Sequence, residues 1–205
     1  MQPGPQPDET RQEDQDRAQG EPFDLLRHLV GNAFWLLVPI LLLNGLWADR
    51  LPAGYQPPRF DEAIPAYIAL PEQLLRVITF TLPCFVPLSL HTRVQRLGMA
   101  LFVIGTAVYA SSWWLLIAQP SSALASSAVG FLAPAYTPAL WLAGLVLLSE
   151  RTVIPRLPYR RWVYGVIAGA FLLCHNLHAW LVYTRLPHGP AAPTHTLLSL
   201  AGAFW

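Results

Sequence analysis

The sequence predicts an all-α integral membrane protein, a bundle of about five transmembrane helices of which several are bent by proline. Hydrophobic residues make up 54% of the chain and charged residues 12%, whereas a soluble domain carries about 25% charged residues. The mean hydropathy is +0.38. Five apolar runs are each long enough to cross about 30 Å of hydrocarbon as a helix, which satisfies its own backbone in lipid. We therefore expect a single transmembrane domain over residues 23–185.

The predicted spans follow the apolar runs in chain order and cover residues 25–47, 70–90, 97–118, 124–148 and 162–183. The second span has the weakest pattern, because it contains Arg76, Pro83 and Pro87. Arg76 lies near one end of that span, so its long side chain can reach the membrane surface. The sequence therefore favours five spans in spite of this charge.

The two ends of the chain are expected to lie outside the bundle. Residues 1–22 are rich in Pro, Gln, Asp and Glu and contain no aromatic or branched aliphatic residue, which predicts a disordered polar tail. This acidic start also differs from a cleaved secretory signal, which begins with basic residues. Residues 186–205 end in TLLSLAGAFW, which is too short to span and predicts a short outer tail at the membrane interface.

The distribution of basic residues predicts which side of the membrane each connection occupies. The 13 basic residues are all arginines. None lies between spans three and four, whereas others flank span one or follow spans two and four: Arg11, Arg17, Arg27, Arg93, Arg96, Arg151, Arg156, Arg160 and Arg161. The connection between spans one and two balances its two arginines with acidic residues that include Asp61, Glu62 and Glu72. Because basic residues collect in cytoplasmic connections, we expect the N-terminus in the cytoplasm and the C-terminus outside. The expected location is a cell membrane, specifically a bacterial inner membrane.

Prolines inside the spans predict bent helices. They are Pro39, Pro83, Pro87, Pro134 and Pro138. Each proline removes one helical hydrogen bond and leaves the carbonyl four residues earlier without its partner. The segments FTLPCFVP and FLAPAYTP repeat this pattern at an offset of 51 residues, from 80–87 to 131–138. The sequence leaves open whether they are an internal repeat or a coincidence.

Glycines in two spans predict where helices pack closely. Gly98 and Gly105 lie on one stripe of span three, and Gly165 and Gly169 lie on one stripe of span five. Small residues let helix backbones approach each other, which is a main source of helix association in lipid. We therefore expect both stripes to be helix contacts.

Five polar residues within the spans are candidates for a polar lining or for helix contacts: Asn32, Asn44, His175, Asn176 and His178. His175 and His178 are three residues apart, so they share a helix face. Our hypothesis is that these histidines donate to span four near the carbonyl freed by Pro134. Two such imidazoles could also hold a metal ion. Because no carboxylate lies nearby in sequence to orient them, we predict no metal site and no cofactor.

The remaining patterns favour a non-enzymatic function. Every Asp and Glu falls outside the spans or at their edges, whereas proton-coupled transport usually needs an intramembrane carboxylate. No P-loop, dinucleotide fingerprint or nucleophile elbow is present, so no catalytic residue is predicted. We expect an accessory, assembly or interaction subunit whose partners are the lipid bilayer and another membrane protein, and not a nucleic acid. The alternative is a small transporter or a solute- or metal-binding protein that uses spans two and four with the His175/His178 face.

Overall fold

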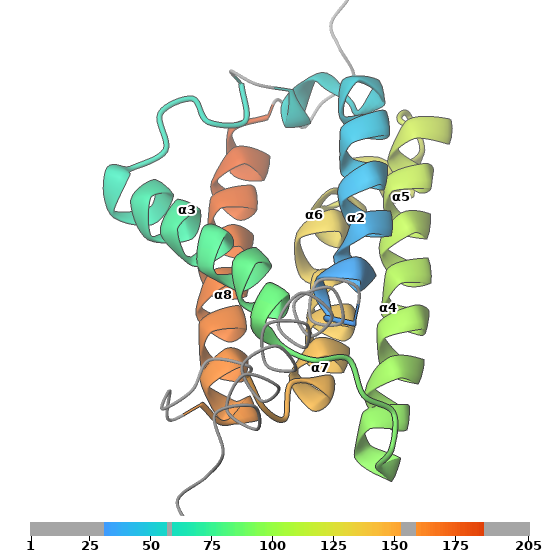
Figure 1. Ribbon diagram of the computed structural model, residues 1–205. Coiled ribbons are helices and arrows are strands. Elements are labelled where there is room, and N and C mark those ends of the chain that lie inside the picture. The colour runs from blue at the N-terminus through green and yellow to red at the C-terminus, as the bar shows by residue number, and fades with distance from the viewer. Residues whose placement is uncertain (1–30, 57–58, 153–158, 187–205) are drawn as a thin grey trace, which may run out of the picture.

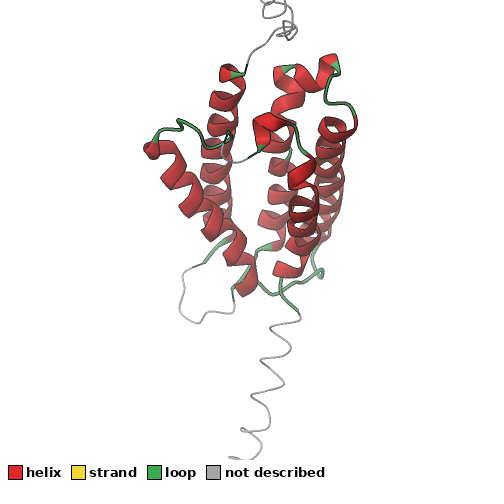
Figure 2. Cartoon of the chain, turned by 90° about the horizontal axis from the view of Figure 1, so that it is seen from above, coloured by secondary structure: helices red, strands yellow, loops and turns green. Residues whose placement is uncertain are grey.

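The computed structural model describes residues 31–56, 59–152 and 159–186, and these residues form a helical bundle (Figures 1 and 2). Four helical segments in this part of the chain are long and apolar enough to cross a membrane: Ala66–Phe85, Arg93–Ala118, Ala128–Leu148 and Arg161–Arg185. Large apolar side chains on these segments remain exposed, including Leu74, Leu97 and Leu173. Exposed apolar surface on this scale is compatible with contact to lipid.

The first predicted span is described only in part. Its helix α2 runs from Phe34 to Trp47 and contains Pro39, so at about 1.5 Å per residue it falls short of about 30 Å. Residues 25–30 lie outside the described residues, as do the predicted tail 1–22 and residues 187–205 of the predicted outer tail. Four of the five predicted spans are therefore matched by candidate spanning helices in the described residues, and the first span stays a prediction.

The second predicted span begins and ends earlier than expected. Helix α3 covers Ala66–Thr81 and continues into the 3-10 turn η3, Leu82–Phe85. Pro83 has no N–H for the carbonyl of Thr79, and the Tyr164 hydroxyl donates to that carbonyl instead, at 3.2 Å. Pro87 lies beyond the helix, in an isolated bridge with Asn32, so the expectation that it bends a helix is wrong.

Helix α4, Arg93–Ala118, packs most extensively against α7, Pro138–Leu148. A Cβ atom on Gly105 would lie 2.4 Å from the backbone nitrogen of Trp141, and one on Gly98 would lie 2.9 Å from the carbonyl oxygen of Gly144. The stripe of span three is therefore a close helix contact, as expected.

The glycine stripe of span five is different. A Cβ atom on Gly165 would meet only the Val146 side chain, at 3.5 Å, and one on Gly169 would meet no described atom within 4 Å. The expectation that Gly169 lies in a tight helix contact is therefore wrong.

The fourth predicted span is divided into three helices, α5 (Ala123–Ser126), α6 (Ala128–Tyr136) and α7. The side chain of Ser127 accepts from Gly130 N and so caps α6. Pro134 lies inside α6, whereas Pro138 begins α7 after a break at Thr137. The Thr137 hydroxyl donates to the carbonyl of Ala133 at 2.7 Å. These breaks place prolines in the centre of the bundle, beside α8.

Helix α8, Arg161–Arg185, contacts α3, α6 and α7. Figure 1 shows α3 lying obliquely against α8, whereas α4 and α8 stand nearly parallel. The short 3-10 turns η1 (Ala48–Arg50) and η2 (Ala53–Tyr55) cross one end of the bundle between α2 and α3. The core between the helices is rich in aromatic residues, among them Tyr109, Trp141, Tyr164 and Phe171.

Candidate ligand cavity and buried polar cluster

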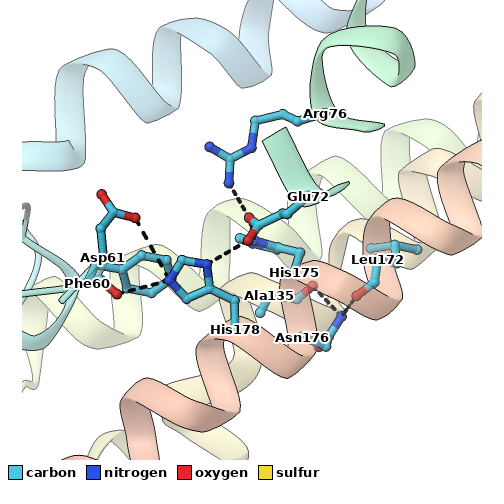
Figure 3. Close-up of polar contacts among 9 residues, drawn as sticks. All are labelled: Phe60, Asp61, Glu72, Arg76, Ala135, Leu172, His175, Asn176 and His178. Carbon is cyan, nitrogen blue, oxygen red and sulfur yellow. Dashed lines mark hydrogen bonds and ion pairs between the residues drawn. The ribbon is translucent and has the colours of Figure 1, made fainter. Parts of the chain in front are cut away.

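The histidines of α8 face a carboxylate on α3 (Figure 3). Nδ1 of His178 lies 2.6 Å from Oε2 of Glu72, and Nδ1 of His175 lies 2.9 Å from Oε1 of the same residue. Arg76, one turn further along α3, donates to Oε1 of Glu72 as well. The side chains of Glu72 and His178 are each only 3% exposed. A buried carboxylate with three donors around it is well compensated for its loss of water.

This arrangement corrects the hypothesis that the histidines donate to span four. Sequence reasoning assigned Glu72 to the acidic connection before span two, but α3 begins at Ala66, so Glu72 lies in its second turn. A signal was present: Glu72 and Arg76 are spaced i, i+4, as expected for an ion pair on a helix. Glu72 thus lies in the second turn of a candidate membrane span and is buried there, rather than in the connection before it.

The loop of residues 60–63, here called the covering loop, lies over the imidazole of His178. The ring of Phe60 stacks on the imidazole with centroids 4.4 Å apart, and its carbonyl oxygen lies 2.9 Å from Nε2 of His178. Oδ1 of Asp61 lies 3.9 Å from the same nitrogen. Arg185 fixes this loop by donating to the carbonyls of Glu62 and Ala63, at 2.8 and 3.0 Å. Ala63 adopts a positive φ of 55°, a conformation that costs a non-glycine residue about 1–2 kcal/mol and that these contacts hold in place.

The three asparagines serve different contacts. Asn176 donates to the carbonyls of Ala135 and Leu172, at 3.0 and 2.8 Å. It therefore links α8 to the broken span four, which is the role that we expected of the histidines. Asn44 accepts from the Tyr109 hydroxyl at 2.7 Å. Asn32 lies near the opposite end of α2, where its side chain accepts from the backbone nitrogen of Phe34.

A cavity of about 320 Å³ adjoins the cluster, a volume within the range of small-molecule pockets. Its walls come from η2, the covering loop and six helices, and include Asn44, Tyr55, Phe60, Arg76, Phe80, Tyr109, Trp113, Pro134, Ala135, Pro138, Trp141, Phe171 and His175. The prolines of span four thus line the cavity. The alternative prediction placed a site at these prolines and the His175 face, and the structure brings those parts together.

Three polar groups of the cavity residues have no hydrogen-bond partner within the described chain. They are the indole N–H groups of Trp113 and Trp141 and the hydroxyl of Tyr55. Burial raises the pKa of the Tyr55 phenol above its ordinary value, so this hydroxyl stays protonated and able to donate. Buried donors without partners are uncommon, and each one needs a physical explanation.

The cluster does not have the geometry of a metal centre. No group of three His, Cys, Asp or Glu side chains in the described part of the chain is placed to hold a metal ion. Arg76 also donates to the carboxylate that would be the central ligand, and a guanidinium there repels a metal cation. Cys84 and Cys174 are free thiols on different helical segments.

Comparison with known proteins gives no match for this chain among protein-family models, curated proteins or solved structures. The function is therefore argued from the geometry of the cavity and the cluster.

Proposed function

We propose that the protein is a multi-pass membrane protein that binds a small apolar molecule with oxygen acceptors in the cavity beside α8. The observation that carries this proposal is the buried and unpartnered indole N–H of Trp141 in the cavity wall. A buried donor without a partner costs about 1–3 kcal/mol. A ligand oxygen next to this N–H would recover that cost, so the site favours ligands that carry acceptors.

The other lining groups support the same ligand chemistry. Arg76 and Tyr55 supply further N–H and O–H donors. Much of the remaining wall is aromatic, and it includes Phe80, Tyr109 and Phe171. Flat aromatic walls with a few convergent polar groups are typical of small-molecule sites. These features describe a site for a planar apolar body with a carbonyl or carboxylate group.

The accessory role expected from the sequence is less well supported than this binding role. One of its reasons was that every Asp and Glu lies outside the spans or at their edges, and Glu72 weakens that reason because it is buried in the second turn of α3. The two functions differ in an observable property. A binding protein is stabilised by its solute alone, whereas an accessory subunit is expected to co-purify with a larger complex.

Ligand binding can be tested with three aromatic probes of nearly the same shape. Methyl 2-naphthoate and 2-naphthoate carry oxygen acceptors, whereas naphthalene carries none. We expect the two oxygen-bearing probes to raise the unfolding temperature of the purified full chain in mild detergent and to quench tryptophan fluorescence. At a probe concentration of 100 Kd, the stabilisation should be about 2.7 kcal/mol. Naphthalene should bind at least several-fold more weakly.

Two variants locate the binding. Trp141→Phe keeps the aromatic wall but removes one unpartnered N–H, and should weaken the preference for methyl 2-naphthoate over naphthalene. Ala135→Leu adds bulk to a buried residue of the cavity wall and should abolish binding of all probes. Ala100→Leu, at an exposed position of α4, is the matched control and should bind as the wild type does. Equal binding in Ala135→Leu and wild type would refute the cavity as the site.

Membrane orientation is proposed from the arginines. Arg93 and Arg96 lie in the first turn of α4 and Arg151 follows the end of α7, and Figure 1 places the start of α4 and the end of α7 at the same end of the bundle. We expect this end to be cytoplasmic. In a bacterial host, a membrane-impermeant thiol reagent should label Ser121→Cys in intact cells, but should label Arg151→Cys only after lysis. Both variants should carry serine in place of Cys84 and Cys174. The reverse pattern would invert the proposed orientation.

A further inference from the structure

We infer that the ligand class is a small apolar carboxylic acid, bound as its anion together with one proton that the Glu72, His175 and His178 cluster takes up. This inference rests on the proposed binding function and adds the chemistry of the ligand and its coupling to protons. Three features of the cluster carry it, namely the protons on His178, the shared carboxylate of Glu72, and the charge around the cavity.

The hydrogen bonds of His178 define where its protons lie. Nε2 faces the carbonyl oxygen of Phe60 at 2.9 Å, and a carbonyl can only accept, so Nε2 carries a hydrogen. Nδ1 faces Oε2 of Glu72 at 2.6 Å. That contact needs one further proton, either on nitrogen as an imidazolium beside a carboxylate or on oxygen as a carboxylic acid beside a neutral imidazole. The contact therefore describes the protonated form of the pair, and loss of this exchangeable proton leaves two lone pairs facing each other.

Glu72 connects this proton to the cavity. Its second oxygen, Oε1, contacts Nδ1 of His175 at 2.9 Å, and His175 is one of the residues that line the cavity. The two oxygens of one carboxylate thus join a buried histidine, 3% exposed, to a histidine at the ligand site that is 21% exposed. A negative charge bound in the cavity lies beside His175, which shares the carboxylate of Glu72 with His178. It therefore changes the proton affinity of both imidazoles.

The charge around the cavity determines which way the proton moves. Arg76 and Glu72 cancel each other, so the cluster carries one positive charge when the proton between Glu72 and His178 is present and no net charge when it is absent. Asp61 contributes little because its side chain is 72% exposed. An anion that enters this apolar cavity needs a compensating positive charge. Imidazole is the side chain that gains a proton most readily near neutral pH, and the cluster has two of them.

No other element adjoining the cluster offers a better proton acceptor. From α3 the facing ionisable groups are Glu72 and Arg76, and from the covering loop the facing group is Asp61. The phenols of Tyr55 and Tyr109 also line the cavity, and both are neutral near pH 7. The residues that α2, α6 and α7 contribute to the wall have no ionisable side chain. The proton comes from water, adds to an imidazole nitrogen, and leaves when the anion leaves, with no bond of the ligand broken.

The experiment counts protons for a matched acid and ester. Binding of 2-naphthoate and of methyl 2-naphthoate to the full chain in detergent is measured by calorimetry in two buffers with different heats of ionisation. At a pH at which the ligand-free cluster has lost its proton, we expect close to one proton taken up per 2-naphthoate, and none per methyl ester at any pH. As the pH rises through the range in which imidazole loses its proton, the affinity for 2-naphthoate should fall by up to tenfold per pH unit. The affinity for the ester should stay constant.

Variants identify where the proton is held. His178→Gln, at a residue that does not line the cavity, should bind the methyl ester as the wild type does but should lose most of the proton uptake and pH dependence with 2-naphthoate. The double variant with His175→Gln should lose all of both. His91→Gln, at an exposed site outside the cavity, is the control and should change neither. Proton uptake that persists in the double variant would place the proton on the ligand and overturn the inference. So would binding of 2-naphthoate without any uptake, whereas failure of both probes to bind would overturn the proposed function itself.

Discussion

The Gly105→Ala variant is expected to lose about 2 kcal/mol or more of its free energy of unfolding. The added Cβ atom would lie 2.4 Å from the backbone nitrogen of Trp141 and 2.8 Å from the carbonyl carbon of Leu140. These are backbone atoms and cannot rotate away, so α4 and α7 must separate. Overpacking of this kind typically costs about 1–3 kcal/mol and occasionally more. The better helix propensity of alanine returns at most about 1 kcal/mol.

The measurement is thermal unfolding in mild detergent, followed by far-UV circular dichroism, and the expected fall in Tm is about 4–8 °C. Gly169→Ala is the matched control, because no described atom lies within 4 Å of the Cβ position. That variant should be unchanged or up to about 1 kcal/mol more stable. Equal Tm values for the two variants would show that α4 and α7 are not in close backbone contact.

The contrast between the two glycine stripes shows what sequence patterns can and cannot predict. Both stripes have suitable spacing, but only Gly98 and Gly105 lie opposite another small residue or a backbone, namely Gly144 and Trp141 of α7. Spacing along one helix predicts a face, whereas a close contact also requires a complementary face on a second helix. The sequence alone does not identify that second helix.

The helices themselves were largely predictable, because apolar composition and length decide them locally. The break in span four follows from Pro138, which lacks an N–H and begins α7. The start of α3 was harder to predict. Residues 60–65, FDEAIP, have the composition of a polar loop, and this loop was predicted to extend further along the chain than it does. Glu72 was therefore grouped with the loop acids, although α3 begins six residues before it, at Ala66.

The cavity could not be predicted from the sequence for a different reason. Its wall combines residues from η2, the covering loop and six helices, and their distances depend on how the helices pack. The sequence identified Asn44, Pro134, Pro138 and His175 as candidates, but it gave no information on Trp141 or Phe60. A residue that contributes one unpartnered N–H to a shared wall has no local signature.

Removing the carboxylate of Glu72 is expected to have the largest effect within the polar cluster. In Glu72→Leu, the buried imidazole of His178 loses its acceptor, and the contact from Arg76 is lost as well. Breaking a buried ion pair by removing one partner costs about 3–5 kcal/mol. Glu72→Gln should lose about half as much, because its amide can donate to Nδ1 of His178 while its oxygen accepts from Arg76. Thermal unfolding in detergent measures both losses, with Glu62→Gln on the exposed loop as the control.

A triple variant separates stability from function in this cluster. Replacing Glu72, His175 and His178 together by leucine removes the donors along with the acceptor, and Arg76, with a side chain 41% exposed, can turn to water. Replacing a whole buried ionic group by apolar side chains is often neutral or stabilising. We therefore expect the triple variant to be more stable than Glu72→Leu alone, and within about 1 kcal/mol of the wild type. If it is, the cluster is not required for folding, and its two histidines and carboxylate are better explained by binding at the cavity. A triple variant as unstable as the single one would show instead that the cluster holds α3 against α8.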